Sequence, residues 1–183
     1  MSRPAVFLDR DGTLIEERGY LDRLDMLEIF PWTSDAIRLL NRAGFATVVI
    51  TNQAAIGRGI IDEPFLRLVH DTMDARFAAG GARIDAYYFC PHHPDASCTC
   101  RKPAPGMIER ACREMQLDPR RSVMVGDRWL DVACGHAAGT RSVLVRTGHG
   151  GHEEEQAPAG ARADAILNNL MEAVGWILRT CSH

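Results

Sequence analysis

The chain has 183 residues, 46% of them hydrophobic, and a formal net charge of -3 at pH 7. This length supports one sizeable core and is too short for two ordinary domains, so we expect a single domain over residues 1–183. No run of Lys or Arg points to a nucleic-acid partner, and no apolar stretch approaches the roughly 18 residues that cross a membrane. The first residues do not resemble a secretory signal, so we expect a cytoplasmic protein, a monomer by default, whose partner is a small molecule.

Short apolar runs bounded by polar or turn residues are typical of buried strands in a parallel sheet. Five such runs recur along the chain, and a further apolar triplet at 165–167 follows them. Polar or glycine-bearing segments separate the runs, as expected of strands that alternate with helices. The runs cover residues 5–8, 46–50, 85–89, 122–125 and 141–145.

Between these runs, apolar residues spaced three or four apart predict amphipathic helices. Thr33 and Ser34 are candidate caps of the first helix, and Gly44 is its expected stop. Its buried face is expected to hold Ile37, Leu40 and Ala43, and that of the second helix Phe65, Leu68, Val69, Met73 and Phe77. The helices are expected at residues 33–44, 62–79, 106–115, 129–138 and after 167.

Three segments lack a sustained helical or strand period and are expected to be loops. Residues 14–30 mix charges with glycine and single apolar side chains, and we expect a mobile flap over the site. Residues 56–59, Ile-Gly-Arg-Gly, form a glycine-bearing loop that could reach a phosphate or a sugar. Residues 147–162 are rich in Gly, Glu, Ala and Pro, which predicts an exposed loop in which His149 and His152 have no special role.

Strands that alternate with helices predict an α/β fold, a three-layer sandwich around a mostly parallel sheet. Ligands bind at the carboxyl ends of such strands, and polar side chains follow three of the predicted strands there. Asp9 and Asp11 follow the first strand, Thr51 the second and Asp127 the fourth. Because residues two apart in an extended chain point the same way, Asp9 and Asp11 can converge.

These side chains suit the hydrolysis of a phosphate monoester, which is among the slowest uncatalysed reactions known. A carboxylate that takes the phosphoryl group divides the reaction into two steps, but its repulsion from phosphate requires a divalent cation between them. Oxygen ligands suit Mg²⁺, and Asp9 and Asp127 supply them. Asp11 is then free to donate and accept protons. Thr51 and Lys102 supply a hydroxyl and a cation for the phosphoryl oxygens.

A second metal site is predicted in the proline-rich loop at residues 90–105. Three cysteines and one histidine make a closed set of Zn²⁺ ligands with no position left for water, so we expect a structural role. His93 is the rival of His92 in this set, and reduced cysteines without a metal are the alternative. The zinc is expected to aim Lys102, which follows the loop. The predicted ligands are Cys90, His92, Cys98 and Cys100.

Four stretches resemble, in order, the four motifs of the haloacid-dehalogenase-type (HAD) phosphatases. They are Asp-Arg-Asp-Gly-Thr at 9–13, Thr-Asn-Gln at 51–53, Arg-Lys-Pro at 101–103 and Gly-Asp with a further Asp at 126–131. The resemblance covers nearly the whole chain and implies a HAD-like Rossmannoid fold and an Mg²⁺-dependent phosphoric monoester hydrolase. The spacing of the motifs leaves no room for the large cap domain of that fold, so we expect a small loop to shape specificity. It implies that Asp9 is the nucleophile and Asp11 the general acid and base. It also implies that Mg²⁺ binds Asp9, the backbone carbonyl of Asp11, and Asp127.

Within this family, residues 52–59, 105–107 and 145–148 resemble the heptose-bisphosphate phosphatases, with the histidinol-phosphate phosphatases as the alternative. The resemblance implies removal of the C7 phosphate of D-glycero-D-manno-heptose 1,7-bisphosphate through an aspartyl-phosphate, in the synthesis of lipopolysaccharide heptose. Two departures affect the expected substrate contacts: Ala54-Ala55 stand where Ser-Gly is common, and Arg128 replaces a Lys beside the metal-binding Asp. A catalytically silent metal-binding module on the same fold is the alternative from a different class.

Polar residues around the predicted centre are the candidates for substrate binding. Residues 17–20 align with the family's substrate-binding flap, although a flap is expected to be polar in any case. Arg101 is equally consistent with a solvated or salt-bridged residue. Asp131 lies either behind the Mg²⁺ ligands or simply at a helix start, where the helix dipole favours a carboxylate. The candidates are Glu17, Arg18, Gly19, Tyr20, Asn52, Gln53, Arg101 and Arg128.

Overall fold

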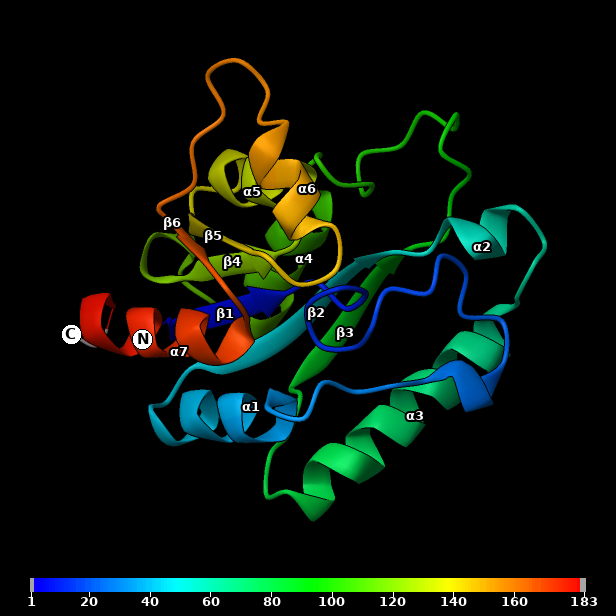
Figure 1. The fold of residues 1–183 in the computed structure, drawn as a ribbon, viewed down its shortest axis with the longest axis horizontal. Helices are drawn as coiled ribbons and strands as arrows, with labels where there is room; N and C mark the ends of the chain where they lie inside the picture. The colour runs from blue at the N-terminus through cyan, green and yellow to red at the C-terminus, as the bar shows by residue number, and fades with distance from the viewer. Residues whose placement is uncertain (1, 182–183) are drawn as a thin grey trace.

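One six-stranded sheet organises the molecule, and all its neighbouring strands are parallel (Figure 1). The computed structural model describes residues 2–181. The strand order β3-β2-β1-β4-β5-β6 places the first strand in the middle of the sheet. This arrangement confirms the predicted α/β class. The strands are β1 (Ala5–Leu8), β2 (Ala46–Asn52), β3 (Ala86–Cys90), β4 (Val123–Gly126), β5 (Arg141–Val145) and β6 (Ala165–Leu167).

Helices cover both faces of the sheet and complete the three predicted layers (Figure 1). The helices are α1 (Thr33–Arg42), α2 (Ala54–Gly57), α3 (Glu63–Ala79), α4 (Gly106–Met115), α5 (Trp129–Ala137), α6 (Gly150–Glu155) and α7 (Leu170–Thr180), with short 3-10 turns η1 (Leu24–Met26) and η2 (Pro119–Arg121). Side chains of α1, α3 and α7 pack on one face, and those of α4 and α5 on the other. Within the described residues, no helix is both long and apolar enough to span a bilayer.

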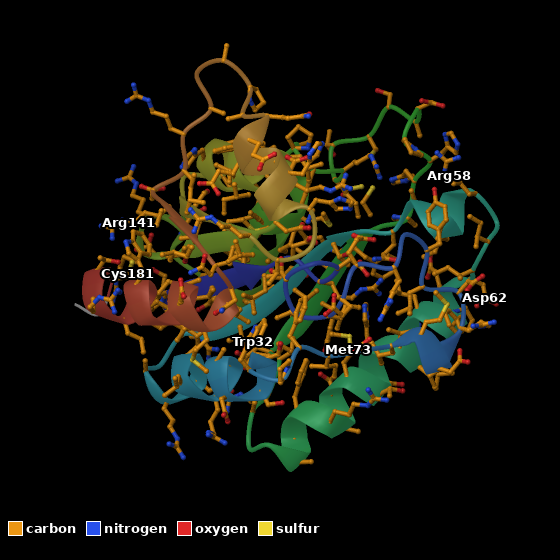
Figure 2. The ribbon with its side chains drawn as sticks, in the orientation of Figure 1. Trp32, Arg58, Asp62, Met73, Arg141 and Cys181 are labelled. Atoms are coloured by element: carbon orange, nitrogen blue, oxygen red, sulfur yellow. The ribbon has the colours of Figure 1, made fainter. Side chains whose placement is uncertain are left out.

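Strand β1 shows why its sequence is continuously apolar. Successive side chains of a strand point to opposite faces, so Val6 and Leu8 enter the layer of α1, α3 and α7. Ala5 and Phe7 enter the opposite layer. All four are fully buried because β1 is an inner strand with helices on both sides. Figure 2 shows Met73 of α3 between its helix and the sheet, within the first of these layers.

The first helix starts differently from the prediction. α1 follows Trp32 without a side-chain cap, so the expected capping by Thr33 and Ser34 is wrong. The Thr33 hydroxyl instead donates to the Leu14 carbonyl oxygen (2.9 Å) and ties the helix to the flap. Ala43, predicted to be buried, lies past the last helical residue and is exposed. A hydroxyl near a helix start can satisfy a tertiary partner as readily as a backbone amide, and the sequence does not distinguish the two.

The second long helix begins as predicted but buries a different stripe. Asp62 is the N-cap of α3, and its side chain accepts from the Phe65 backbone N–H (2.8 Å). Leu68, predicted to be buried, is 49% exposed, whereas Leu66 and His70 are buried. The face of α3 that is buried contains His70, a polar residue, so it shows a weaker hydrophobic period than the neighbouring face with Leu68. The prediction chose the face with the stronger period and was wrong for Leu68.

Residues 147–162, predicted as an exposed loop, contain the helix α6. Its first residues, Gly150 and Gly151, are poor helix formers, so propensity alone does not indicate a helix. Tertiary contacts hold it: the backbone N–H of Trp129 donates to the Glu153 carboxylate (2.8 Å), and the Trp129 indole N–H donates to the Glu153 carbonyl oxygen (2.6 Å).

The flap at residues 14–30 has irregular structure, as predicted, but is tied to the core at several points. Ile15 bridges to Ile29 across the segment, and the flap contributes several buried apolar side chains. Of its described residues, Glu17, Gly19 and Tyr20 line the pocket described below. The buried side chains are Leu14, Ile15, Leu21, Leu27 and Phe30.

Candidate active site and metal loop

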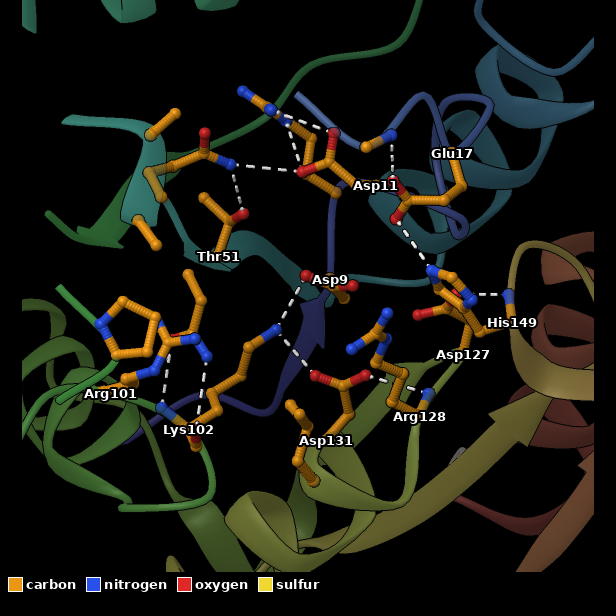
Figure 3. A pocket seen from close by; sticks show the side chains of 18 of the residues that line it. Asp9, Asp11, Glu17, Thr51, Arg101, Lys102, Asp127, Arg128, Asp131 and His149 are labelled. Carbon is orange, nitrogen blue, oxygen red and sulfur yellow. Dashed lines mark hydrogen bonds and ion pairs between the residues drawn. The ribbon is translucent and has the colours of Figure 1, made fainter. Parts of the chain in front are cut away.

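A pocket of about 500 Å³ opens at the carboxyl ends of β1, β2 and β4 (Figure 3). Because these strands are parallel and adjacent, they bring residues far apart in the sequence to one edge of the sheet. The lysine predicted to contact phosphate enters from the loop after β3. The residues with predicted catalytic or Mg²⁺-binding roles that line the pocket are Asp9, Asp11, Thr51, Lys102, Asp127 and Asp131.

Three buried carboxylates lie together in this pocket. One side-chain oxygen from each of Asp9, Asp127 and Asp131 lies within 4.8 Å of the other two. Burial raises the pKa of Asp9 to about 7, against the opposing charge of Lys102, and burial together with the charge of Asp9 raises the pKa of Asp127 to about 8. Crowded oxygen donors that repel one another suit a hard divalent cation, so this set fits Mg²⁺. Asp131 therefore lies among the candidate Mg²⁺ ligands themselves, whereas its sequence position suggested either a place behind them or a simple helix-start role.

Lys102 is 3% exposed, and three oxygen atoms lie around its ammonium group, those of Asp9 and Asp131 being visible in Figure 3. Its Nζ donates to Asp9 Oδ1 (2.7 Å) and to the Ile50 carbonyl oxygen (2.9 Å), and it pairs with Asp131 Oδ1 (2.6 Å). Burial opposes the charge, but the two carboxylates outweigh it and raise the pKa of Lys102. Asn52 fixes the Lys102 backbone, because Lys102 N–H donates to Asn52 Oδ1 (3.0 Å) and Asn52 Nδ2 donates to the Lys102 carbonyl oxygen (3.2 Å).

Asp127 is seated between two glycines. Gly12 and Gly148 have φ values of +77° and +58°, and a Cβ atom on either would collide with the Asp127 carboxylate. The His149 backbone N–H donates to Asp127 Oδ2 (2.7 Å), and the Thr147 hydroxyl donates to the Gly12 carbonyl oxygen (2.6 Å). The loop after β5 therefore closes directly onto the loop after β1 and fixes this carboxylate.

Asp11 has different partners from the three grouped carboxylates. Arg10 donates to it twice, from Nε to Oδ2 (3.1 Å) and from Nη2 to Oδ1 (2.9 Å). Gln53 Nε2 donates to Asp11 Oδ2 (3.1 Å) and also to Thr51 Oγ1 (2.9 Å). The side chain of Asp11 is therefore directed away from the cation-binding group, which is compatible with the expected contact through its backbone carbonyl.

The pocket also contains most of the predicted substrate-binding residues. Arg18 is not among them, since it points to the surface and pairs with Glu28. His149, expected to have no special role, lines the pocket with Nε2 3.5 Å from Glu17 Oε2. Its position follows from the contact of its backbone with Asp127, which no local sequence signal indicates. The predicted residues that line the pocket are Glu17, Gly19, Tyr20, Asn52, Gln53, Arg101 and Arg128.

Residues 56–59 do not line the pocket, so the expectation that this loop reaches a phosphate or sugar is wrong. Ala54 and Ala55, just before it, do line the pocket. Gly57 instead packs against the backbone of His93, where a Cβ atom would not fit. Arg58 lies at the outer surface beside α2 (Figure 2). Gly57 therefore allows close packing against the backbone of residues 91–93.

The four predicted zinc ligands come together in one cluster. Cys90 Sγ lies 3.2 Å from Cys100 Sγ and 3.7 Å from Cys98 Sγ, and His92 Nδ1 lies 3.2 Å from Cys100 Sγ. Zn–S bonds of about 2.3 Å in a tetrahedron separate sulfur atoms by about 3.8 Å, close to this spacing, whereas a disulfide needs about 2.0 Å. His93, the rival ligand, pairs with Asp95 outside the cluster (3.3 Å). The donor set therefore fits zinc with His92 as its nitrogen ligand.

Comparison with known proteins places these features in context. A HAD-hydrolase-like family model matches residues 99–173. The D-glycero-beta-D-manno-heptose-1,7-bisphosphate 7-phosphatase of Yersinia pestis is 44% identical over 93% of each chain, and that of Escherichia coli K12 is 41% identical over 93% of this chain and 92% of its own. The crystal structure of D,D-heptose 1,7-bisphosphate phosphatase from B. bronchiseptica, complexed with magnesium and phosphate, superposes with a TM-score of 0.89 at 32% identity, over 96% of this chain and 98% of that one.

Proposed function

This chain belongs to the D-glycero-beta-D-manno-heptose-1,7-bisphosphate 7-phosphatase family of HAD-like hydrolases, and from that premise we propose that it removes the C7 phosphate of this sugar through a phosphorylated Asp9. The observation that carries the proposal is the grouping of Asp9, Asp127 and Asp131 around Lys102 in one pocket. A catalytically silent module would have no need of a fully buried lysine held beside a carboxylate nucleophile. Turnover by the wild-type protein separates these two classes.

In this proposal Asp9, Asp127 and the backbone carbonyl of Asp11 would hold Mg²⁺, with Asp131, the third carboxylate of the group, beside them and paired with Lys102. When bound, the cation neutralises the carboxylates and the phosphoryl group that must approach them. Asp9 Oδ1 accepts from Lys102, and among the described residues no donor is bonded to Oδ2, which is the oxygen assigned to attack phosphorus. The bond from Asp9 to phosphorus forms as the bond from phosphorus to the C7 oxygen breaks. Water then hydrolyses the aspartyl-phosphate and restores Asp9.

Three further side chains are assigned to the charge and the proton. The ammonium group of Lys102 and the hydroxyl of Thr51 bind phosphoryl oxygens, where charge is spread during transfer. The Thr51 oxygen accepts from Gln53, so its own hydrogen is free to point to the substrate. Asp11 gives a proton to the departing C7 oxygen and later takes one from the attacking water.

The rim of the pocket is assigned to the sugar and to its second phosphate. Arg101 and Arg128 both line the pocket and suit an anionic group at C1. Glu17, Gly19 and Tyr20 of the flap are assigned to sugar hydroxyls. Two rim arginines favour a bisphosphate over histidinol phosphate, because histidinol phosphate has an ammonium group in place of a second phosphate.

Zinc is assigned to Cys90, His92, Cys98 and Cys100 as a structural ion. Cys100 lies two residues before Lys102, so the position of the cluster sets the position of the lysine backbone. We also assign a single catalytic domain that works as a monomer in the cytoplasm. The zinc assignment rests on the fit of the donor set.

The test of the proposal is kcat/KM for purified protein with Mg²⁺ on the β and α anomers of the heptose 1,7-bisphosphate and on histidinol phosphate. We expect the β anomer, for which the relatives are named, to be the best substrate and histidinol phosphate to be the worst. Preference for histidinol phosphate would contradict the substrate assignment. No turnover of any of them would contradict the enzymatic assignment.

A further inference from the structure

We infer that Arg10 and Gln53 are positioning residues that clamp the Asp11 side chain and thereby aim its proton transfer. The inference rests on the proposed role of Asp11 as general acid and base. Together the two residues make three hydrogen bonds to Asp11, all of them from donors that cannot accept in return. We call this pair the Asp11 clamp.

Arg10 supplies the rigid part of the clamp. Its Nε and Nη2 atoms donate to the two different oxygens of Asp11, at 3.1 Å and 2.9 Å, which is the bidentate arrangement that fixes the plane of a carboxylate. Arg10 is only 2% exposed although it carries a charge, whereas the Asp11 side chain is 22% exposed and faces the pocket. A guanidinium this deeply buried is costly unless it is paired, and Asp11 is its partner.

His70 of α3 and Tyr87 of β3 lie near enough to Arg10 for its charge to act on both side chains. His70 stacks on Tyr87 with ring centroids 4.2 Å apart, and the Tyr87 hydroxyl donates to Asp74 (2.7 Å). Burial, together with the nearby charge of Arg10, lowers the pKa of His70 to about 3, so this ring is neutral. A neutral ring allows the guanidinium to remain close, whereas a charged one would repel it.

Gln53 supplies the part of the clamp that joins two catalytic groups. Its single amide nitrogen donates one hydrogen to Asp11 Oδ2 (3.1 Å) and the other to Thr51 Oγ1 (2.9 Å). The orientation of the amide follows from chemistry, because a carboxylate oxygen requires the NH₂ side. Gln53 is 5% exposed, so its amide is screened from competing water. The separation between the proton-transfer carboxylate and the phosphate-binding hydroxyl is thus fixed by one side chain.

The clamp also selects which oxygen of Asp11 transfers the proton. A carboxylate oxygen has two lone pairs in its plane, and Oδ2 uses both, one for Arg10 Nε and one for Gln53 Nε2. Among the described residues, Oδ1 accepts from Arg10 Nη2 alone and keeps one lone pair open. Oδ1 is therefore the atom that gives its proton to the departing oxygen and later accepts one from water.

The experiment uses two phosphate esters that differ in their need for an acid. An alkyl phosphate has a poor leaving group that must be protonated, whereas p-nitrophenyl phosphate has a good one that leaves as the anion. We expect Gln53→Met to lower kcat/KM about 30-fold on the alkyl ester and less than about threefold on the aryl ester, within the total of roughly 100- to 10,000-fold that acid–base catalysis contributes. The ratio kcat/KM reports transfer of the phosphoryl group to Asp9 and excludes the later attack by water, which both esters share. Arg10→Lys keeps the positive charge but cannot donate to both oxygens of Asp11 in the bidentate arrangement, and we expect it to show the same pattern. Gln156→Met, an exposed change of the same type, serves as the control and should leave both rates unchanged.

Equal losses on the two esters would overturn the inference, because loss of phosphate binding through Thr51 or general damage to the pocket does not depend on the leaving group. A second test is the Gln53→Met change in an Asp11→Asn background, where it should cost less than about twofold on the alkyl ester. Additive losses there would also overturn it. If Asp11→Asn itself shows no leaving-group dependence, or the wild-type protein has no phosphatase activity, the proposed function fails and not the clamp alone. Where Arg10→Lys does not fold, Gln53→Met decides the question.

Discussion

Replacing Asp127 with Asn should make the metal-free protein more stable while abolishing its activity. The pKa of Asp127 is raised from 3.8 to about 8 by burial and by Asp9, which corresponds to a penalty on the charged folded state of the order of 5 kcal/mol. Asp9 shares the same repulsion, so we expect the neutral amide to recover about half of it, ~2–3 kcal/mol at pH 8. An Asn side-chain oxygen can still accept the His149 backbone N–H, so the loop should remain in place.

The assay is chemical unfolding of wild-type and Asp127→Asn protein in EDTA at pH 8 and at pH 4.5. A carboxyl with a raised folded-state pKa binds its proton more tightly in the folded state, so wild-type stability should fall as pH rises from about 4 to about 8. The advantage of the variant should therefore be present at pH 8 and nearly absent at pH 4.5. Added Mg²⁺ should stabilise the wild type at pH 8 and not the variant. A variant that is less stable at pH 8, or that gains equal stability from Mg²⁺, would refute the reasoning.

The remaining predictions concern Lys102, the zinc loop and His70. Lys102→Met should lower kcat at least about 100-fold and destabilise the protein by about 3 kcal/mol, because two buried carboxylates lose their cation. Lys102→Arg should not restore activity, since a guanidinium does not fit three acceptors at this spacing. Steady-state kinetics and urea unfolding measure both effects, and full activity in either variant would contradict the role of Lys102. Cys98→Ser should weaken zinc binding, measured by metal analysis after dialysis, and should lower kcat while leaving the free energy of unfolding nearly unchanged. Cys112→Ser is the matched control outside the cluster. Unchanged kcat in zinc-free protein would contradict the positioning of Lys102 by the zinc. His70→Phe should make the free energy of unfolding less sensitive to acid. The pKa of His70 in the folded protein, about 3, lies below its ordinary value of 6.5, so the unfolded state binds a proton first. Wild-type stability should therefore fall as the pH drops through 6.5, by about 2 kcal/mol at pH 5. Identical pH dependence of unfolding in the two proteins would show that His70 is not the cause.

The fold was largely predictable because its strands and helices have clear local signals. β5 and α4 match their predicted bounds to the residue, and the parallel sheet follows from the alternation of apolar runs with amphipathic segments. The resemblance to HAD phosphatases is confirmed by relatives of 41–44% identity over most of the chain. α6 was not predictable, because it begins with two glycines and depends on Trp129, which contacts Glu153 from another helix. Such a helix is specified by tertiary structure and not by its own residues.

Within the site, the sequence indicated which residues meet but not how they bond. The spacing of polar residues after strands placed Asp9 and Asp127 at one edge, and the structure brings Asp131 into the same group. The side-chain partners of Asp11 depend on rotamers and on the buried arginine beside it, which no pattern of residue types encodes. His149 reaches the pocket through a backbone contact, so its identity as a histidine gave no signal.

Detection of phosphate on Asp9 during turnover tests the central claim most directly. Wild-type protein with Mg²⁺ and heptose 1,7-bisphosphate would be quenched in acid within the steady state, digested, and analysed by mass spectrometry for the peptide that contains Asp9. We predict a peptide heavier by one phosphoryl group, with the modification assigned to Asp9 and absent from an Asp9→Asn variant that is folded and inactive. Turnover without a phosphorylated peptide, or activity retained in Asp9→Asn, would contradict the account.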